Sequence, residues 1–313
     1  MLFRSNIISV YKNTYGGINM SLFKGAGVAL ITPFKEDGSV NFEKLIELVD
    51  YHMAHKTDAL IICGTTGEDS TISDEDQVEC VRLVAEHVNK KLPVIAGAGS
   101  NDTMHAVKLS VACQNAGADG ILLVTPYYNK TTQRGLVAHY KAVADAINIP
   151  IIAYSVPGRT GMKITPETCL ELKKIPNIIG IKDAGGDISE TAKIAALCGP
   201  DFDIYSGNDD QTLPILSLGG KGVISVTSNI IPEDMHDLCE AYWAGDIKKA
   251  CELQLGMIGL CDAMFCEVNP IPVKEAMNML GFGVGGCHLP LIEMSESNKA
   301  YVKEEITKYG LLK

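Results

Sequence analysis

The sequence predicts an α/β protein: a (β/α)8 TIM barrel with a C-terminal helical domain. Three observations favour this fold class. Short apolar runs typical of strands buried on both faces alternate with amphipathic helical stretches, and the alternation occurs eight times. Each unit takes roughly 20 to 35 residues, which fits parallel strands covered by helices. No Gly-x-Gly-x-x-Gly follows the first strand, so a closed barrel is favoured over a doubly wound, dinucleotide-binding sheet.

The elements follow in a regular order. The first predicted strand covers 25–32, and apolar residues at helical spacing predict a helix over 41–55. The second strand, 59–63, precedes a glycine-rich loop and a helix that begins after the capping residue Ser73. The further strands are expected at 93–97, 120–124, 150–154, 178–182, 202–206 and 222–226. The helices between them are expected around 103–116, 132–147, 165–174, 189–197 and 212–218.

The last part of the chain is helical without intervening strands. The helices are expected at 232–244, 247–265, 271–280 and 295–308, with a glycine-rich connection at 281–286. We therefore divide the chain into a barrel domain, 22–245, which carries the active site, and a C-terminal helical domain, 246–313. Residues 1–21 are an N-terminal extension, and they are either a disordered arm or the product of a start codon upstream of the functional Met20. We favour the second interpretation.

Composition narrows the function. A net charge of -11 argues against nucleic acid or an anionic membrane as a partner, and no apolar stretch is long enough to span a bilayer. Ten scattered cysteines without a Cys-x-x-Cys pair indicate reduced thiols and a cytoplasmic protein. Seven histidines show no metal-binding spacing, and His52 and His55 lack a carboxylate or thiol partner. We expect no metal and no other cofactor.

Lys182 ends the predicted strand 178–182, with apolar residues behind it. Burial disfavours the charged ammonium, so a lysine at this place gains the nucleophilic free amine. The alternative is an ordinary lysine at the rim, with its stem packed and its charge in water. The other strand ends decide between the two, because barrel chemistry lies where the carboxyl ends of the strands meet.

Four other strand ends carry polar groups. The loop Gly64–Glu68 offers two threonine hydroxyls and backbone N–H groups suited to a small carboxylate, or else a capped strand-to-helix turn. The segments Thr125–Asn129 and Tyr154–Gly161 offer phenols that relay protons and an arginine that binds carboxylates. Taken singly, these are also compatible with aromatic plugs and a solvated arginine. The seventh strand ends in Ser206–Asp209.

Five motifs together carry a resemblance to a known family. They are Gly-Thr-Thr-Gly-Glu at 64–68, Tyr-Tyr-Asn at 127–129, Val-Pro-Gly-Arg-Thr-Gly at 156–161, Ile-Ile-Gly-Ile-Lys-Asp at 178–183 and Gly-Val-Ile-Ser-Val at 222–226. In this order and spacing, they resemble the dihydrodipicolinate synthase family of pyruvate-dependent class I aldolases. The resemblance extends from about Leu22 to the C-terminus.

The resemblance implies a Schiff-base reaction. Lys182 would attack the ketone of pyruvate, and the resulting enamine would add to L-aspartate 4-semialdehyde. The product would be (2S,4S)-4-hydroxy-2,3,4,5-tetrahydrodipicolinate, in the diaminopimelate branch of lysine biosynthesis. Tyr154 would transfer protons beside the imine, and Thr65 and Tyr128 would complete the relay.

The resemblance also implies the binding residues and the assembly. Thr66 would hold the pyruvate carboxylate, Gly207 and Ile224 would shape the pyruvate site, and Arg159 would bind the carboxylate of the semialdehyde. The protein would be a homotetramer built from tight dimers, with Tyr128 reaching across the dimer interface.

Two departures from the family pattern are visible. Ser155 stands where the family often has Asn, which affects only the fine position of the loop. In the lysine feedback site of relatives, histidines and a glutamate are expected, and the corresponding residues here are Asp69, Asp74, Gln77 and His105, whereas Asn101 and Tyr127 match. With the pairing glutamate absent and only Asp69 or Asp74 to substitute for it, we predict weak or absent inhibition by lysine, which an initial-rate assay would check.

Two rival functions remain. N-acetylneuraminate lyase and the keto-deoxy sugar-acid aldolases share the Schiff-base lysine and Tyr154, but the pair Thr65 and Thr66, together with Arg159, favours the synthase. The second rival is a non-catalytic barrel that senses a keto acid or lysine. Binding alone requires neither a desolvated nucleophile nor a proton relay, which argues against a sensor.

Overall fold

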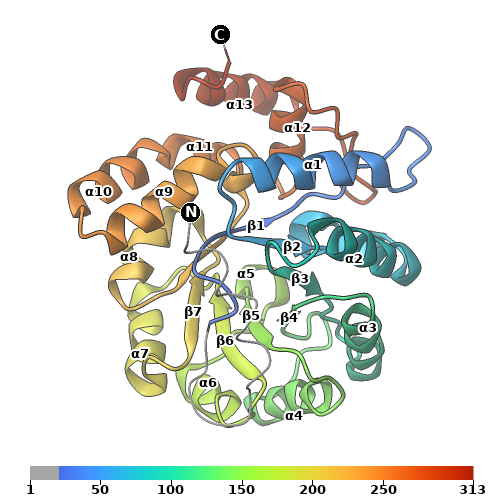
Figure 1. Cartoon of the computed structure of the whole chain (residues 1–313), viewed down its shortest axis with the longest axis vertical. Helices are drawn as coiled ribbons and strands as arrows, with labels where there is room; N and C mark the ends of the chain where they lie inside the picture. Colours follow the sequence, from blue (N-terminus) through green and yellow to red (C-terminus); the bar gives the residue numbers. More distant parts are fainter. Residues whose placement is uncertain (1–20, 313) are drawn as a thin grey trace.

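The computed structural model describes residues 21–312. Within them, eight parallel strands form a closed barrel in sequence order, with β1 paired to β8 (Figure 1). The strands are β1 (Gly25–Ala29), β2 (Ala59–Ile62), β3 (Val94–Gly97), β4 (Gly120–Val124), β5 (Ile151–Ser155), β6 (Ile178–Asp183), β7 (Asp203–Ser206) and β8 (Gly222–Ser225). The predicted barrel is therefore confirmed, with strand limits that differ from the prediction by a few residues.

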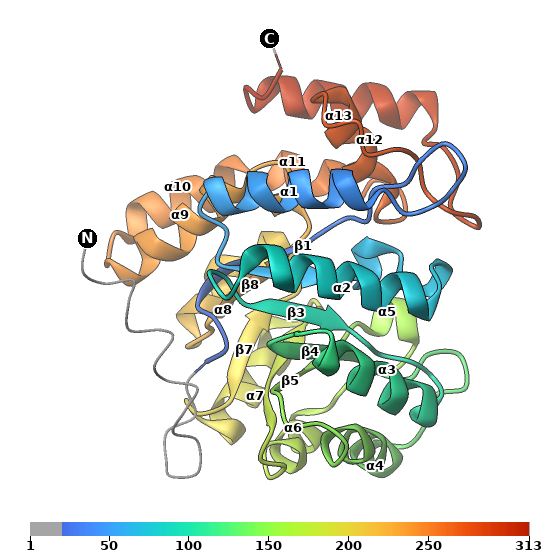
Figure 2. The same ribbon diagram turned by 45° about the vertical axis from the view of Figure 1, so that its right-hand side comes forward.

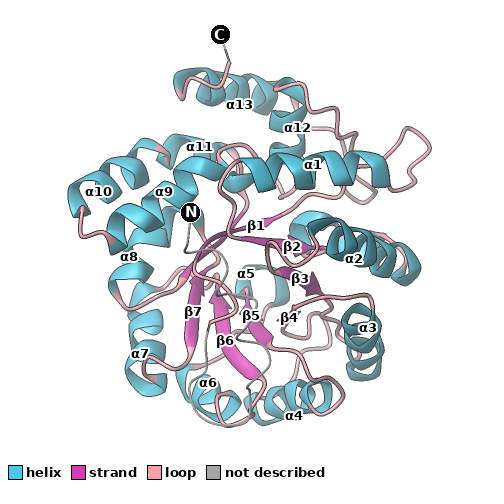
Figure 3. Cartoon of the chain, viewed as in Figure 1, coloured by secondary structure: helices cyan, strands magenta, loops and turns pink. Residues whose placement is uncertain are grey.

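A helix follows each strand and covers the outside of the barrel (Figure 3). These helices are α1 (Phe42–Ala54), α2 (Asp74–Val88), α3 (Thr103–Asn115), α4 (Gln133–Ala144), α6 (Pro166–Leu172), α7 (Ile188–Cys198), α8 (Thr212–Ser217) and α9 (Pro232–Trp243). Short helical turns lie in the loops at the carboxyl ends of the strands: η2 (Thr65–Gly67), η3 (Asp69–Thr71), α5 (Pro157–Thr160), η4 (Asp209–Gln211) and η5 (Thr227–Asn229). As predicted, Ser73 caps α2 by accepting a hydrogen bond from the backbone N–H of Asp76.

The core has two layers, as strands buried on both faces require. One layer packs the outer face of the sheet against the helices, and Ile178 and Ile181 of β6 belong to it. The other fills the barrel interior and consists of residues such as Ile152, Ile179 and Ile224. The two faces of the sheet thus belong to different clusters, so the cluster to which an apolar strand residue belongs tells whether its side chain points outward or into the barrel.

The C-terminal region adds α10 (Ile247–Gly256), α11 (Ile258–Ala263), α12 (Ile271–Met279) and α13 (Glu296–Lys308). α13 packs against α11 and α12 at the end of the molecule that carries the C-terminus (Figure 2). The prediction of one helix over 247–265 was wrong, since the chain forms two helices that meet at Met257. Gly256 and Gly259 flank this junction, and glycine weakens a helix interior because it gives up the most backbone freedom on ordering.

The domain limits at 245 and 246 stay a prediction, and residues 1–20 of the predicted extension lie outside the described residues. None of the described helices has the length and apolar character that spanning a bilayer requires. Among residues 21–312, His, Cys, Asp and Glu side chains form no group of three or more that could hold a metal ion.

Candidate active site

A bulge in β6 turns Lys182 toward the barrel interior. Ile151 of β5 pairs with Ile178, but the next residue, Ile152, pairs with Gly180, so β6 holds one extra residue. Side chains alternate along a strand, and regular alternation from the outward-facing Ile178 would point Lys182 outward as well. With the extra residue, Lys182 pairs with Tyr154, which belongs to the interior cluster.

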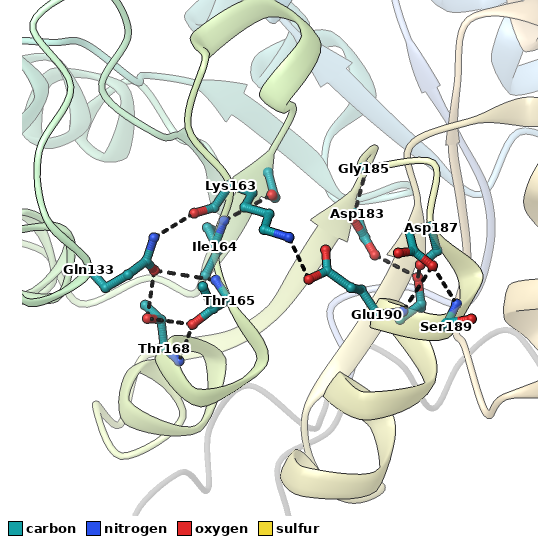
Figure 4. Close-up of polar contacts among 12 residues, drawn as sticks. Gln133, Lys163, Ile164, Thr165, Thr168, Asp183, Gly185, Asp187, Ser189 and Glu190 are labelled. Atoms are coloured by element: carbon teal, nitrogen blue, oxygen red, sulfur yellow. Dashed lines mark hydrogen bonds and ion pairs between the residues drawn. The ribbon is translucent and has the colours of Figure 1, made fainter.

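The residue after Lys182 fixes the strand end from outside. Asp183 accepts hydrogen bonds from the hydroxyl of Thr191 on α7, at 2.7 Å, and from the backbone N–H of Gly185, at 3.0 Å. An ion pair between Lys163 and Glu190 also ties α7 to the segment before α6 (Figure 4). With Asp183 held outward by these contacts, the preceding lysine is held inward.

Lys182 lies between two tyrosines of neighbouring strands. Its side chain is 5% exposed, and its Nζ lies 4.4 Å from the ring centroid of Tyr154. On the other side it pairs in register with Tyr205, whose hydroxyl donates to the carbonyl of Phe23. Burial lowers the pKa of Lys182 to about 8, with the Arg159 charge adding to this effect and the Asp209 carboxylate opposing it. The free amine is therefore far more abundant near neutral pH than it would be at the ordinary pKa of 10.5.

Tyr154 keeps its proton next to this amine. Burial raises the pKa of its phenol to about 12, although the charge of Arg159 and a hydrogen bond with Thr65 act in the opposite direction. The phenol is thus in its protonated form and is ready to donate. Of the residues predicted as catalytic, the structure brings Lys182, Tyr154 and Thr65 together.

A small recess opens beside these residues. It is lined by Gly64, Thr65, Asp69, Gly97, Gly99, Leu122, Val124 and Tyr154. Burial raises the pKa of the Asp69 carboxyl, and the charge of Arg159 offsets part of this rise; the resulting pKa is about 6. An apolar wall with a few polar groups is the usual character of a small-molecule site.

The C-terminal region connects Thr66 with Arg159. Asn269, in the segment before α12, donates from its side chain to the hydroxyl of Thr66 at 2.9 Å. Its backbone carbonyl accepts from the guanidinium of Arg159 at 3.0 Å. Thr66 is buried, whereas Arg159 in α5 is exposed at the entrance. The two residues predicted to bind carboxylates are therefore linked through one residue.

Of the two remaining binding residues, one follows β7 and the other lies in the adjacent strand β8. Gly207 follows β7 and donates its backbone N–H to the carbonyl of Asp183 at 2.7 Å, and a Cβ here would lie only 2.6 Å from that of Ala184. Glycine is needed because β6 and β7 approach so closely. Ile224 of β8 is fully buried in the interior cluster.

Tyr128 is the predicted catalytic residue that the structure does not bring to the other three. Its side chain is 92% exposed, and its backbone has a φ of 66°. A left-handed backbone is rare for a residue with a bulky side chain, so the loop holds this phenol outward at a cost. The predicted role of Tyr128 across a dimer interface stays a prediction.

Sequence reasoning missed three polar residues around the site. Asp69 was assigned only to a lysine site, although it lines the recess with Thr65. Asp209 follows β7, and the seventh strand end gave a signal for it; its Oδ2 accepts from the backbone N–H and hydroxyl of Thr227. Asn269 gave none, because it lies far along the chain in a helical region.

The predicted lysine site forms a cluster near the recess. The Asp74 carboxylate contacts Nε2 of His105 at 2.9 Å, and the buried amide of Gln77 donates to the carbonyl of Gly97. Asn129 donates to the carbonyl of Asn101. Since Asp74 already has a partner, Asp69 is left as the replacement for the absent glutamate, and weak lysine inhibition stays a prediction.

Fold and site define a class of protein, a (β/α)8 barrel with a buried lysine at the carboxyl ends of its strands. The model of the Dihydrodipicolinate synthetase family matches residues 22–309. The chain therefore belongs to this family, and the resemblance inferred from five motifs is confirmed.

Individual relatives agree over nearly the whole length. The chain is 58% identical over 292 residues to the 4-hydroxy-tetrahydrodipicolinate synthase of Caldicellulosiruptor bescii, covering 93% of this chain and 99% of the relative. It is 56% identical over 295 residues to the enzyme of that name from a Thermoanaerobacter species, covering 94% and 99%. The crystal structure of dihydrodipicolinate synthase from Thermotoga maritima matches with a TM-score of 0.91 and 41% identity, covering 93% of this chain and all of that chain.

Proposed function

We propose that the chain is a 4-hydroxy-tetrahydrodipicolinate synthase, which condenses pyruvate with L-aspartate 4-semialdehyde. The observation that supports this most directly is the buried amine of Lys182, held against the protonated phenol of Tyr154 at the end of the barrel. The family and the full-length relatives support the same activity.

The first step is formation of the Schiff base. The free amine of Lys182 adds to the ketone carbon of pyruvate, and loss of water leaves a protonated imine. The pKa of about 8 makes the amine available, and the apolar interior stabilises the neutral form before attack. Thr66 and the backbone N–H groups around it bind the pyruvate carboxylate, a role that fits the buried and fixed position of this loop.

The second step forms the new carbon–carbon bond. The iminium withdraws electrons, so that the methyl group loses a proton and an enamine forms. Tyr154, bonded to Thr65, donates and accepts the protons of these steps. The enamine carbon attacks the aldehyde of the semialdehyde, whose carboxylate Arg159 binds at the entrance. The amine of the second substrate then attacks the imine carbon and closes the ring. This displaces the amine of Lys182, so the product leaves and the enzyme is regenerated.

Assembly and location are part of the proposal. We infer a homotetramer of tight dimers in which Tyr128 of one subunit completes the proton relay of its neighbour. The exposed, outward-held Tyr128 supports this, because a phenol in water gains little from an unfavourable backbone conformation. We also place the protein in the cytoplasm, in keeping with ten cysteines that are all unpaired.

Borohydride trapping tests the function. The protein is incubated with pyruvate and borohydride, and the peptides are weighed; a reduced adduct is expected on the peptide with Lys182, while the other lysine peptides serve as internal controls. Untreated enzyme is then compared for turnover of pyruvate with aspartate semialdehyde and with sugar aldehydes. Folded protein without an adduct would overturn the Schiff-base mechanism, and turnover of sugar aldehydes alone would favour a sugar-acid aldolase.

A further inference from the structure

Glu68 lies at the turning point of the loop that carries Thr65 and Thr66. It separates η2 from η3, and its backbone has a φ of 58°. A left-handed conformation is disfavoured for a glutamate, so side-chain contacts must hold it. The residue is 3% exposed although it carries a carboxyl group.

Both carboxylate oxygens of Glu68 contact the C-terminal region. Oε1 accepts from Nζ of Lys274 on α12 at 2.7 Å, and Oε2 accepts from the backbone N–H of His288 at 2.8 Å. The side chains of the ion pair are only 2% and 1% exposed. A loop of the barrel is thus held by a charge pair that spans 206 residues of sequence.

Lys274 is held in place by further contacts. Its Nζ donates to the carbonyl of Gly286 and lies 4.0 Å from the ring centroid of Phe34. The same Phe34 ring stacks on the ring of His288, with 3.7 Å between the two centroids. The ammonium therefore has a carboxylate, a carbonyl and an aromatic face around it, and its position is closely defined.

The same segment reaches the substrate side of the loop. Asn269, five residues before Lys274, donates to Thr66 and accepts from Arg159. Contacts from the C-terminal region therefore hold the Thr66 hydroxyl directly and the end of its loop through Glu68.

A buried ion pair adds little to the stability of the fold, because apolar residues of similar volume in its place often stabilise the protein equally or more. A hydrogen-bonded ion pair does fix the direction and the distance between its two side chains, whereas apolar contacts have no preferred direction. We infer that Lys274 and Glu68 are positioning residues, which hold the Thr65–Thr66 loop in the conformation that binds the 2-oxo acid. This inference rests on the proposed function for its substrate, although the loop contacts do not depend on it.

The decisive variant removes both charges together. Glu68→Gln with Lys274→Met keeps the volumes and leaves no unpaired charge, so the protein is expected to fold. We expect kcat/KM for pyruvate and the rate of adduct formation on Lys182 to fall by about 10- to 100-fold, because a displaced loop misplaces the bound keto acid. KM for aspartate semialdehyde should change little. The matched control is the surface pair Lys56→Met with Asp237→Asn, whose ion pair is half exposed and which should behave like the natural protein.

Hydrogen exchange separates positioning from stability. We expect the amides of 64–71 to exchange faster in the double variant while its thermal midpoint stays close to that of the natural protein. Unchanged loop exchange together with an unchanged kcat/KM for pyruvate would overturn the inference. If the natural protein forms no pyruvate adduct but the loop exchange still rises, the positional inference stands and the proposed function fails.

Discussion

Two buried lysines of this molecule differ in what surrounds their charge. Lys182 is 5% exposed and Lys274 is 1% exposed, and burial lowers the pKa of both. Lys274 forms an ion pair with Glu68, which opposes that shift through charge and hydrogen bonding. Among residues 21–312, no carboxylate forms an ion pair with Lys182. The comparison teaches that the partner, and not burial alone, separates a nucleophile from an anchor.

The largest expected effect is the loss of chemistry in Lys182→Met. Without the amine no imine forms, and we expect turnover to fall by more than about a thousandfold. Initial rates with pyruvate and aspartate semialdehyde check this. Lys274→Met, measured on the folded fraction, should still form the adduct on Lys182; equal losses in the two variants would break the comparison.

The second effect concerns the bulge in β6 that turns Lys182 inward. A Cβ at Gly180 would overlap the carbonyl oxygen of Asp203 on β7. Gly180→Ala should therefore push β6 away from β7, move Lys182 relative to Tyr154 and slow adduct formation by about 10- to 100-fold. Gly256→Ala is the control, since nothing lies within 4 Å of its added Cβ. Normal trapping kinetics in Gly180→Ala would show that Lys182 tolerates movement of its strand.

The third effect is on stability: replacement of Lys274 should destabilise the protein, whereas replacement of Lys182 should stabilise it at neutral pH. Lys274→Met leaves Glu68 buried without its ammonium partner, and we expect the free energy of unfolding to fall by about 3–5 kcal/mol. The double variant, which adds Glu68→Gln, should recover most of the lost free energy of unfolding. Urea unfolding measures both. A Lys274→Met protein as stable as the natural one would show that water or a rearranged loop replaces the pair.

The smallest effect is the pH dependence of Lys182. Its pKa is lowered from 10.5 to about 8, so the folded protein holds fewer protons than the unfolded chain between these values. The penalty for the buried charge is therefore complete below about pH 8 and disappears as the pH rises toward 10.5. We expect Lys182→Met to be more stable than the natural protein at pH 7, with a difference that shrinks at pH 10. Adduct formation should rise with pH through about 8 and then level off; a rate that keeps rising to pH 10 would place the pKa near its ordinary value.

Local pattern was enough for most of the architecture and for naming candidate residues of the site. Strands buried on both faces read as apolar runs because no face needs polar residues, and their fixed alternation with helices leaves few topologies. Helix interiors were less certain, as the break at Met257 shows, because the cost of one glycine depends on what packs around it. The sequence could predict that Lys182, Tyr154 and Thr65 lie together, because barrel strands bring their carboxyl ends to one place.

By itself, the sequence determined the class of fold, the family and the residues with reactive groups, since each of these depends on residue types at spacings along the chain. Tertiary structure alone decided which way the groups face and what holds them. The inward turn of Lys182 depends on pairing between β5 and β6, which the composition of β6 does not reveal. The contacts of Glu68 with Lys274 and of Thr66 with Asn269 join residues more than 200 positions apart, and no local pattern encodes such a distance.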